Sequence, residues 1–111
     1  MTYERFTVIR VPFPFTDRNT SKRRPALVLS SAPEFNTPIS HSVMAMITSA
    51  HHSPWPLDCL LRDLKQAGLP APSKVRFKLF TLDHRLIDGV LGRLSNHDGA
   101  RVENALQRLF N

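Results

Sequence analysis

The chain has 111 residues, enough for one domain over residues 1–111 and too few for a second domain with its own core. Hydrophobic residues make up 41% and charged residues 22%, as in soluble globular proteins, and no apolar stretch approaches the ~20 residues of a membrane span. Fifteen Lys and Arg against nine Asp and Glu give a net charge of +6, which favours nucleic acid or an acidic protein as partner, although many small basic proteins have neither.

The N-terminus and the single cysteine favour a cytoplasmic protein. No apolar segment follows the charges of residues 1–5, so we expect no signal peptide. Cys59 is the sole cysteine, which excludes an internal disulfide and a multi-cysteine zinc site and favours a reducing compartment. We predict neither a metal nor a cofactor.

The first half of the chain predicts three strands separated by two loops. Residues 6–11 are rich in β-branched side chains, which favour a strand. Residues 26–31 and 43–48 are continuous apolar runs, the pattern of strands buried on both faces. Between these strands we expect a polar loop over 16–24 and a long loop, rich in Pro, Ser and Asn, over 32–42.

The second half predicts a loop over 51–56, where prolines flank Trp55, and a short strand over 57–61. Residues 74–79 then alternate strictly, which predicts one packed face and one cationic face. The packed side chains would be those of Val75, Phe77 and Leu79, and the cations those of Lys74, Arg76 and Lys78. An edge strand that uses lysines against aggregation gives the same pattern.

The last segment predicts a helix. Apolar residues recur at helical spacing at Val102, Ala105, Leu106, Leu109 and Phe110. Ser95 and Asp98 resemble a capping box, although Gly99 weakens the first turn. Short strands followed by a terminal helix predict a mainly β chain with helices (α+β), arranged as a small antiparallel barrel or half-barrel.

Six segments, in order and at the right spacing, resemble the MazF/PemK-like family of type II toxin–antitoxin toxins. They are VIRVPFPFTD at 8–17, KRRPALVLS at 22–30, ITS at 47–49, GLPAPS at 68–73, FTLD at 80–83 and LGRLS at 91–95. The resemblance implies an SH3-like barrel of the CcdB/MazF type with a C-terminal helix. It also implies a two-fold homodimer that binds single-stranded RNA in a groove, and a cognate antitoxin whose acidic tail occupies the same region.

The implied activity is that of an mRNA interferase, an endoribonuclease that cuts RNA without a metal. The 2′-OH attacks the adjacent phosphate and leaves a cyclic phosphate and a 5′-OH. Arg24 matches the arginine of the family's Arg-Pro pair and would stabilise the transition state, although an arginine there also suits a structural ion pair. Thr48 would hold a phosphate oxygen or the 2′-OH, and Arg76 would assist; a threonine there is also an ordinary β-former.

Three departures from the family remove the obvious general base. Lys78 stands where the family has an aspartate, Asn19 where it has a glutamate, and Phe6-Thr7 where it has Gly-Asp. Asp17 is the nearest substitute carboxylate, although a turn aspartate often bonds only its own backbone. Loss of acid–base catalysis lowers a rate by roughly 10²–10⁴-fold, which leaves a slow enzyme or only a binder.

A wider set of residues is predicted to contact RNA. The polar loop (16–24) and the alternating strand (74–79) supply cations for phosphates. The aromatic rings of Phe15 and Trp55 are candidates for base stacking. The loop after the Ile-Thr-Ser motif carries two histidines, His51 and His52. A neutral histidine there is a candidate base, although adjacent loop histidines are more often solvated than functional. The predicted RNA-binding residues are Arg18, Lys22, Arg23, Lys78, Phe15, Thr16, Asp17, Asn19 and His51.

Two rival functions stay open at this point. The first is a MazF-like binding module without catalysis, which holds RNA or an antitoxin, or reaches operator DNA through the antitoxin complex. The second is gyrase poisoning, as in CcdB relatives that share the implied fold. No sequence feature demands gyrase.

Overall fold

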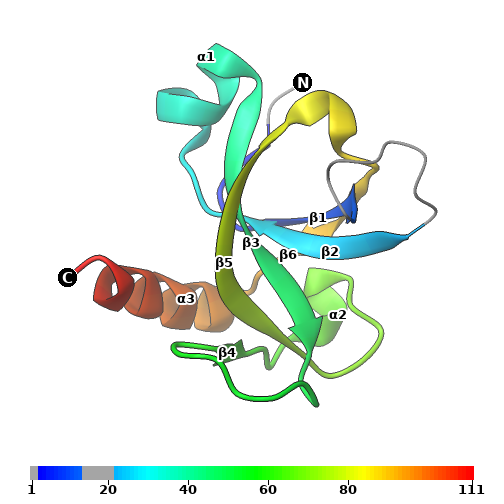
Figure 1. Ribbon diagram of the computed structural model, residues 1–111, viewed down its shortest axis with the longest axis vertical. Helices are drawn as coiled ribbons and strands as arrows, with labels where there is room; N and C mark the ends of the chain where they lie inside the picture. Colours follow the sequence, from blue (N-terminus) through cyan, green and yellow to red (C-terminus); the bar gives the residue numbers. More distant parts are fainter. Residues whose placement is uncertain (1–2, 14–21) are drawn as a thin grey trace.

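The computed structural model describes residues 3–13 and 22–111. Six strands form one antiparallel sheet in the order β4-β5-β3-β2-β1-β6. The strands are β1 (Thr7–Pro12), β2 (Arg23–Val28), β3 (His41–Ser49), β4 (Cys59–Leu60), β5 (Ser73–Asp83) and β6 (Val90–Arg93). The sheet is curled into a half-barrel, in which β1 and β2 run across the long β3–β5 pair (Figure 1).

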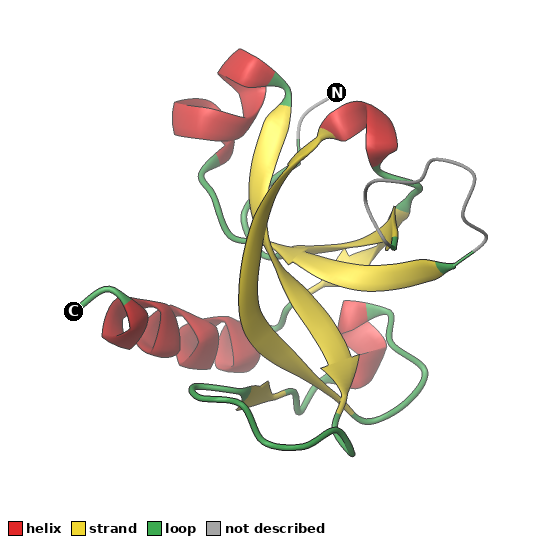
Figure 2. Ribbon diagram, viewed as in Figure 1, coloured by secondary structure: helices red, strands yellow, loops and turns green. Residues whose placement is uncertain are grey.

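Helical segments lie around this sheet, and the C-terminal helix packs against one of its faces (Figure 2). They are a π-helical turn (Ala32–Asn36), α1 (Thr37–Ile39), α2 (Leu64–Ala67), a 3-10 turn (His84–Leu86) and α3 (Asn96–Leu109). Among the residues that the structure describes, no helix has the length and apolar character needed to cross a membrane.

The curl gives the sheet a hydrophobic core on each face. One core joins Leu27 and Ile47 to Val102 of α3, and the other joins Ile9, Val28 and Met44. Because neighbouring residues of a strand point to opposite faces, a strand between two cores is apolar throughout. The continuous apolar run of β2 is therefore buried on both faces, as predicted.

The long loop predicted over residues 32–42 is wrong, because most of it is helical. The Ser31 hydroxyl accepts a hydrogen bond from the Glu34 N–H (3.3 Å), and a proline stands in the first turn, where its missing N–H is tolerated. Asn36, fully buried, donates to the backbone oxygens of Tyr3 (2.7 Å) and Ser30 (3.0 Å). Composition indicated a loop, whereas capping and a buried amide decide the helical turns.

A short helix that the sequence did not predict, α2, ends at Gly68. This glycine has a φ of 74°, and a Cβ there would lie 2.0 Å from the backbone oxygen of Leu91. No other residue type fits such a close approach. The glycine therefore ends α2 and lets it pack against β6.

In the strand predicted over residues 74–79, the apolar face is buried at Val75 and Phe77 but not at Leu79. Ala45 of β3 lies opposite Leu79 and Met46 lies opposite Arg76, so two residues of β5, Phe77 and Lys78, bulge out of register. Phe77 is buried, but Leu79 is 38% exposed. Leu79 lies opposite Ala45 as Val75 lies opposite Ile47, so it keeps the predicted face, but the prediction that it is packed is wrong, because its side chain stays outside the core.

Helix α3 starts as predicted but uses its capping residues differently. The Ser95 hydroxyl accepts from the Asp98 N–H (3.1 Å). The buried Asp98 carboxylate does not return to Ser95; it accepts from the backbone N–H groups of Arg62 (3.1 Å) and Asp63 (2.9 Å), which precede α2. Asp98 therefore joins two helices rather than closing one.

Asp98→Ala is expected to lower the free energy of unfolding by about 2 kcal/mol, because it leaves partly buried backbone donors without an acceptor. The measurement is urea unfolding followed by circular dichroism. Asp88→Ala, which removes a half-exposed carboxylate paired with Arg23, is the control and should change stability by less than about 1 kcal/mol. Equal losses in the two variants would contradict the role given to Asp98.

Candidate functional site

A cleft of about 220 Å³ opens where β2, β3 and β5 lie side by side. Its described lining residues are Phe13, Arg24, Met46, Ile47, Thr48, His52, Arg76 and Lys78. The three residues predicted to be catalytic come from three different strands. Antiparallel register brings them together. Ala26 of β2 pairs with Met46 of β3, and Met46 pairs with Arg76 of β5. Arg24 lies two residues before Ala26 and Thr48 two residues after Met46, so both lie toward the same end and on the same face of the sheet.

Arg24 and Arg23 are neighbours in sequence but project from opposite faces of the sheet. The Arg24 guanidinium lies over the ring of Phe13, 5.3 Å from its centroid, inside the cleft. Arg23 instead forms an ion pair with Asp88 (2.8 Å). The structural ion pair considered for Arg24 is thus made by Arg23, and within the described residues Arg24 pairs with no carboxylate.

Thr48 contacts the histidine that the sequence analysis did not select. Its hydroxyl is hydrogen-bonded to Nδ1 of His52 (2.5 Å), and the His52 ring lines the cleft. His51, predicted to bind RNA, is exposed beside the cleft, and its N–H donates to the Ser49 hydroxyl (3.2 Å). A tight turn after β3 decides which of the two adjacent histidines faces Thr48.

Asp58, which the sequence analysis missed, joins the loop after β3 to strand β5. Its carboxylate accepts from Arg76 Nη2, from Lys74 Nζ and from the Trp55 N–H, each at 3.1 Å. The same cations reach the loop backbone, Lys74 at the carbonyl of His52 (2.7 Å) and Arg76 at that of Ser53 (2.5 Å). Two strand cations and one carboxylate thus hold the loop against the cleft.

Burial and hydrogen bonding act on Asp58 in opposite directions. Burial raises the pKa of its carboxyl group, but hydrogen bonds from Arg76, Lys74 and the Trp55 backbone outweigh burial, so the pKa lies below its ordinary value. All three side chains are mostly buried, with 13% of Asp58, 9% of Lys74 and 13% of Arg76 exposed. Asp58 is therefore an ionised anchor and a poor proton acceptor at neutral pH.

Trp55 lies against two cations that line the cleft. Lys78 Nζ lies 5.0 Å and the Arg76 guanidinium 5.5 Å from the centroid of its ring. The side chain is still 40% exposed. An aromatic ring that is held by cations and open to solvent provides a surface on which a nucleobase can stack.

The remaining predicted residues fall outside the cleft or outside the described chain. Lys22 is exposed beside it, and its carbonyl accepts from the Phe13 N–H (3.2 Å). Phe15, Thr16, Asp17, Arg18 and Asn19 belong to the segment that the structure does not describe. Over residues 3–13 and 22–111, no group of three or more His, Cys, Asp or Glu side chains is placed to hold a metal ion.

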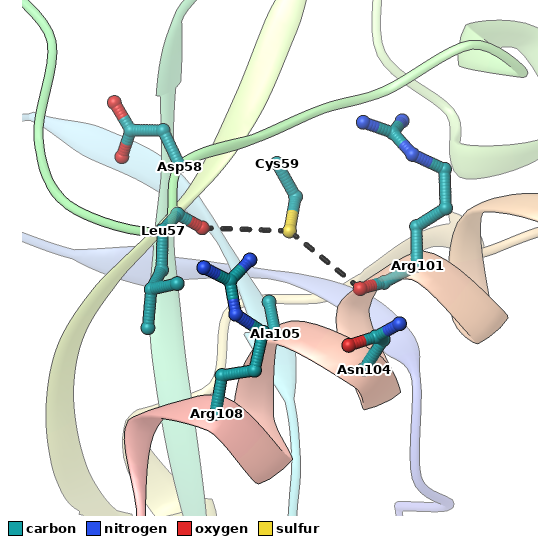
Figure 3. Close-up of a pocket in the computed structure, with 7 residues that line it drawn as sticks. All are labelled: Leu57, Asp58, Cys59, Arg101, Asn104, Ala105 and Arg108. Atoms are coloured by element: carbon teal, nitrogen blue, oxygen red, sulfur yellow. Dashed lines mark hydrogen bonds between the residues drawn. The ribbon is translucent and has the colours of Figure 1, made fainter.

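A second cleft, of about 240 Å³, lies between residues 57–59 and α3 (Figure 3). Its floor includes Cys59, whose thiol contacts the backbone oxygens of Leu57 (3.5 Å) and Arg101 (3.9 Å). Burial raises the pKa of this thiol, so it is a weak nucleophile. Asp58 also lines this cleft, but its carboxylate points away from Cys59 (Figure 3) and pairs with Arg76, which lines the first cleft.

Asp58→Asn should lower the free energy of unfolding at neutral pH by about 3 kcal/mol, because it leaves two buried cations without their counter-charge. The folded-state pKa lies below the unfolded one, so this contribution is complete above roughly pH 5 and is lost as the pH falls through the folded-state pKa. Urea unfolding of both proteins from pH 7 down into acid measures this difference.

Glu103→Gln is the matched control, since Glu103 pairs with Arg5 at a half-exposed site. It should change stability by less than about 1 kcal/mol. A difference between the original chain and Asp58→Asn that persists unchanged in acid would show that the loss is not electrostatic.

Comparisons with known proteins address the family and the fold. A family model described as PemK-like, MazF-like toxin of type II toxin–antitoxin system matches residues 4–110. No curated protein matches the chain. The chain is similar to a MazE–MazF structure from Deinococcus radiodurans, with 21% identity and a TM-score of 0.76 over 100% of this chain and 97% of that one.

Two mycobacterial structures are also similar. An endoribonuclease in complex with its cognate antitoxin, from a Mycobacterial species, has 15% identity and a TM-score of 0.74 over 96% of this chain and 92% of that one. The Mycobacterium tuberculosis toxin MazF-mt6 has 19% identity and a TM-score of 0.70, covering 94% and 95%. These similarities confirm the predicted barrel of the CcdB/MazF type with its C-terminal helix. Since the family model spans nearly every residue, the chain belongs to the PemK-like, MazF-like toxins of type II toxin–antitoxin systems.

Proposed function

We propose that this toxin is an endoribonuclease that cuts single-stranded RNA by attack of a 2′-OH on the adjacent phosphate. The observation that carries the proposal is the cleft in which Arg24, Thr48 and Arg76 lie together beside Lys78. Three cations around one hydroxyl suit a phosphate whose negative charge grows in the transition state. The reaction needs no metal ion.

Each of these residues has a task that its chemistry allows. Arg24 is free of any described carboxylate, so its planar guanidinium is available to two phosphate oxygens. Thr48 offers a hydroxyl that both donates and accepts hydrogen bonds, which suits a phosphate oxygen or the attacking 2′-OH. Arg76 is neutralised in part by Asp58 and contributes mainly by shaping the wall of the cleft.

The partners follow from the family and the fold. One similar structure is a MazE–MazF complex and another is an endoribonuclease with its cognate antitoxin. We therefore propose a cytoplasmic homodimer that a cognate antitoxin silences. An acidic antitoxin tail would compete with RNA for the same cations.

A binding module without catalysis is the second candidate. It is favoured by Lys78, which stands in the cleft where the family has an aspartate, and by Asp58, whose carboxylate is committed to Lys74 and Arg76. Such a protein would bind RNA or an antitoxin and leave RNA intact.

Arg24→Ala is expected to lower the rate of RNA cleavage by about 10²–10³-fold, because it removes one donor to the transition-state phosphate. The assay incubates purified protein with a long single-stranded RNA in excess EDTA and determines the chemistry of the fragment ends. The original chain should give discrete cuts with cyclic phosphate and 5′-OH ends. Arg85→Ala, at an exposed arginine beyond the far end of β5, should cut normally.

Two results would count against this proposal. RNA that is bound but left intact at enzyme excess supports the binding module. Cleavage that Arg24→Ala leaves unchanged shows that this arginine does not stabilise the reacting phosphate.

Lys78→Gln should weaken RNA binding and make it less dependent on salt. A lysine that contacts one phosphate of a single strand contributes about 0.7 to the slope of log K against log salt concentration. Fluorescence anisotropy of a labelled RNA between low and moderate salt measures this slope for the original chain and for Lys78→Gln. Lys65→Gln, on α2, is the control. Equal slopes for the original chain and Lys78→Gln would remove Lys78 from the phosphate-binding surface.

A further inference from the structure

His52 is held at the cleft by two independent contacts. Its ring Nδ1 is hydrogen-bonded to the Thr48 hydroxyl (2.5 Å), and its backbone carbonyl accepts from Lys74 Nζ (2.7 Å). Lys74 is itself buried and paired with Asp58 (3.1 Å). The ring therefore stands on an anchored backbone and lines the cleft that Arg24 and Arg76 also line.

The other ring nitrogen of His52, Nε2, forms no hydrogen bond with any residue in the described part of the chain. In the tautomer that donates Nδ1–H to the Thr48 oxygen, Nε2 carries a free lone pair. A hydroxyl that contacts one ring nitrogen thus orients the ring and leaves the other nitrogen as an acceptor. The same arrangement selects tautomers in many histidine sites.

The described residues of the cleft offer no other proton acceptor for neutral pH. Arg24, Arg76 and Lys78 are cations, and the hydroxyl of Thr48 is too weak a base. Asp58 is close, but its carboxylate accepts four hydrogen bonds, and its pKa is lowered. Among the described residues this leaves the imidazole of His52; Asp17, the substitute carboxylate considered from the sequence, lies outside them.

We propose that His52 is the general base of this toxin, in the place of the carboxylate that the family carries and this chain lacks. The assignment rests on the proposed ribonuclease function. His52 Nε2 takes the proton of the 2′-OH while the 2′-oxygen forms its bond to phosphorus and the bond from phosphorus to the 5′-oxygen breaks. The leaving 5′-oxygen takes a proton from water, and His52 returns its proton to water, so the step balances.

Thr48 then acts on His52 as well as on RNA. Its hydroxyl holds the ring in place, and when that hydroxyl donates to a phosphate oxygen of the RNA it accepts from Nδ1–H, which leaves Nε2 as the proton acceptor. A threonine at the end of β3 and a histidine four residues later therefore form one functional unit.

His52→Gln tests the assignment, because glutamine keeps a polar side chain but does not accept a proton. The rate of RNA cleavage under single-turnover conditions in EDTA should fall by about 10²–10⁴-fold, whereas RNA affinity should change by less than about threefold. His97→Gln, the same substitution at an exposed residue of α3, is the matched control and should cut like the original chain. Circular dichroism confirms that each variant is folded.

Two further measurements separate a base from a structural residue and from an acid. Free imidazole should restore part of the activity of His52→Ala in a concentration-dependent way, which a merely structural role would not allow. An RNA with sulfur in place of the 5′-oxygen at the mapped cut needs no protonation of its leaving group. The defect of His52→Gln should persist on this substrate.

Four outcomes overturn the proposal. His52→Gln cutting within about threefold of the original chain, or no rescue of His52→Ala by imidazole, removes His52 as the base and leaves the ribonuclease function standing. A defect that disappears on the sulfur substrate makes His52 the acid. RNA left intact by the original chain overturns the ribonuclease function and the assignment together.

Discussion

The carboxylate of Asp58 accepts hydrogen bonds from Arg76, Lys74 and the Trp55 backbone, and the wall of the cleft is built on these contacts. A mostly buried anion between two mostly buried cations is stable only while all three partners are present. Through Lys74 the same network reaches the carbonyl of His52. The positions of the Trp55 ring and the His52 ring therefore both depend on one ionised side chain at the start of β4.

The curl of the sheet explains why a toxin of this size has both a core and an open cleft. Each face of β2 and β3 is apolar along most of its length, and two separate cores cover it. Toward the ends of these strands one face is not covered by core residues, and Arg24, Thr48 and Arg76 are exposed to the cleft there. Positive charge then gathers on a rigid sheet rather than on a flexible segment, which suits the binding of a phosphate at a fixed position.

The bulge in β5 contains Lys78, the residue of this strand that departs from the family motif. Phe77 and Lys78 stand out of register between Arg76 and Leu79, and the ammonium group of Lys78 lies close to the ring of Trp55. The ring of His52 on the neighbouring loop lines the same cleft and contacts Thr48, which is the basis for proposing it as the base.

The sequence by itself determined the mainly β fold with a terminal helix and the family, and its motifs indicated Arg24, Thr48 and Arg76 as candidates, because alternation and short motifs are local properties of the chain. Only the tertiary structure decided that Arg24 rather than Arg23 enters the cleft, that His52 rather than His51 contacts Thr48, and that Asp58 anchors the loop. Each of these depends on which strands pair and in which register, and pairing joins residues far apart in sequence. A pattern within one strand carries no information about the face that a partner strand will cover.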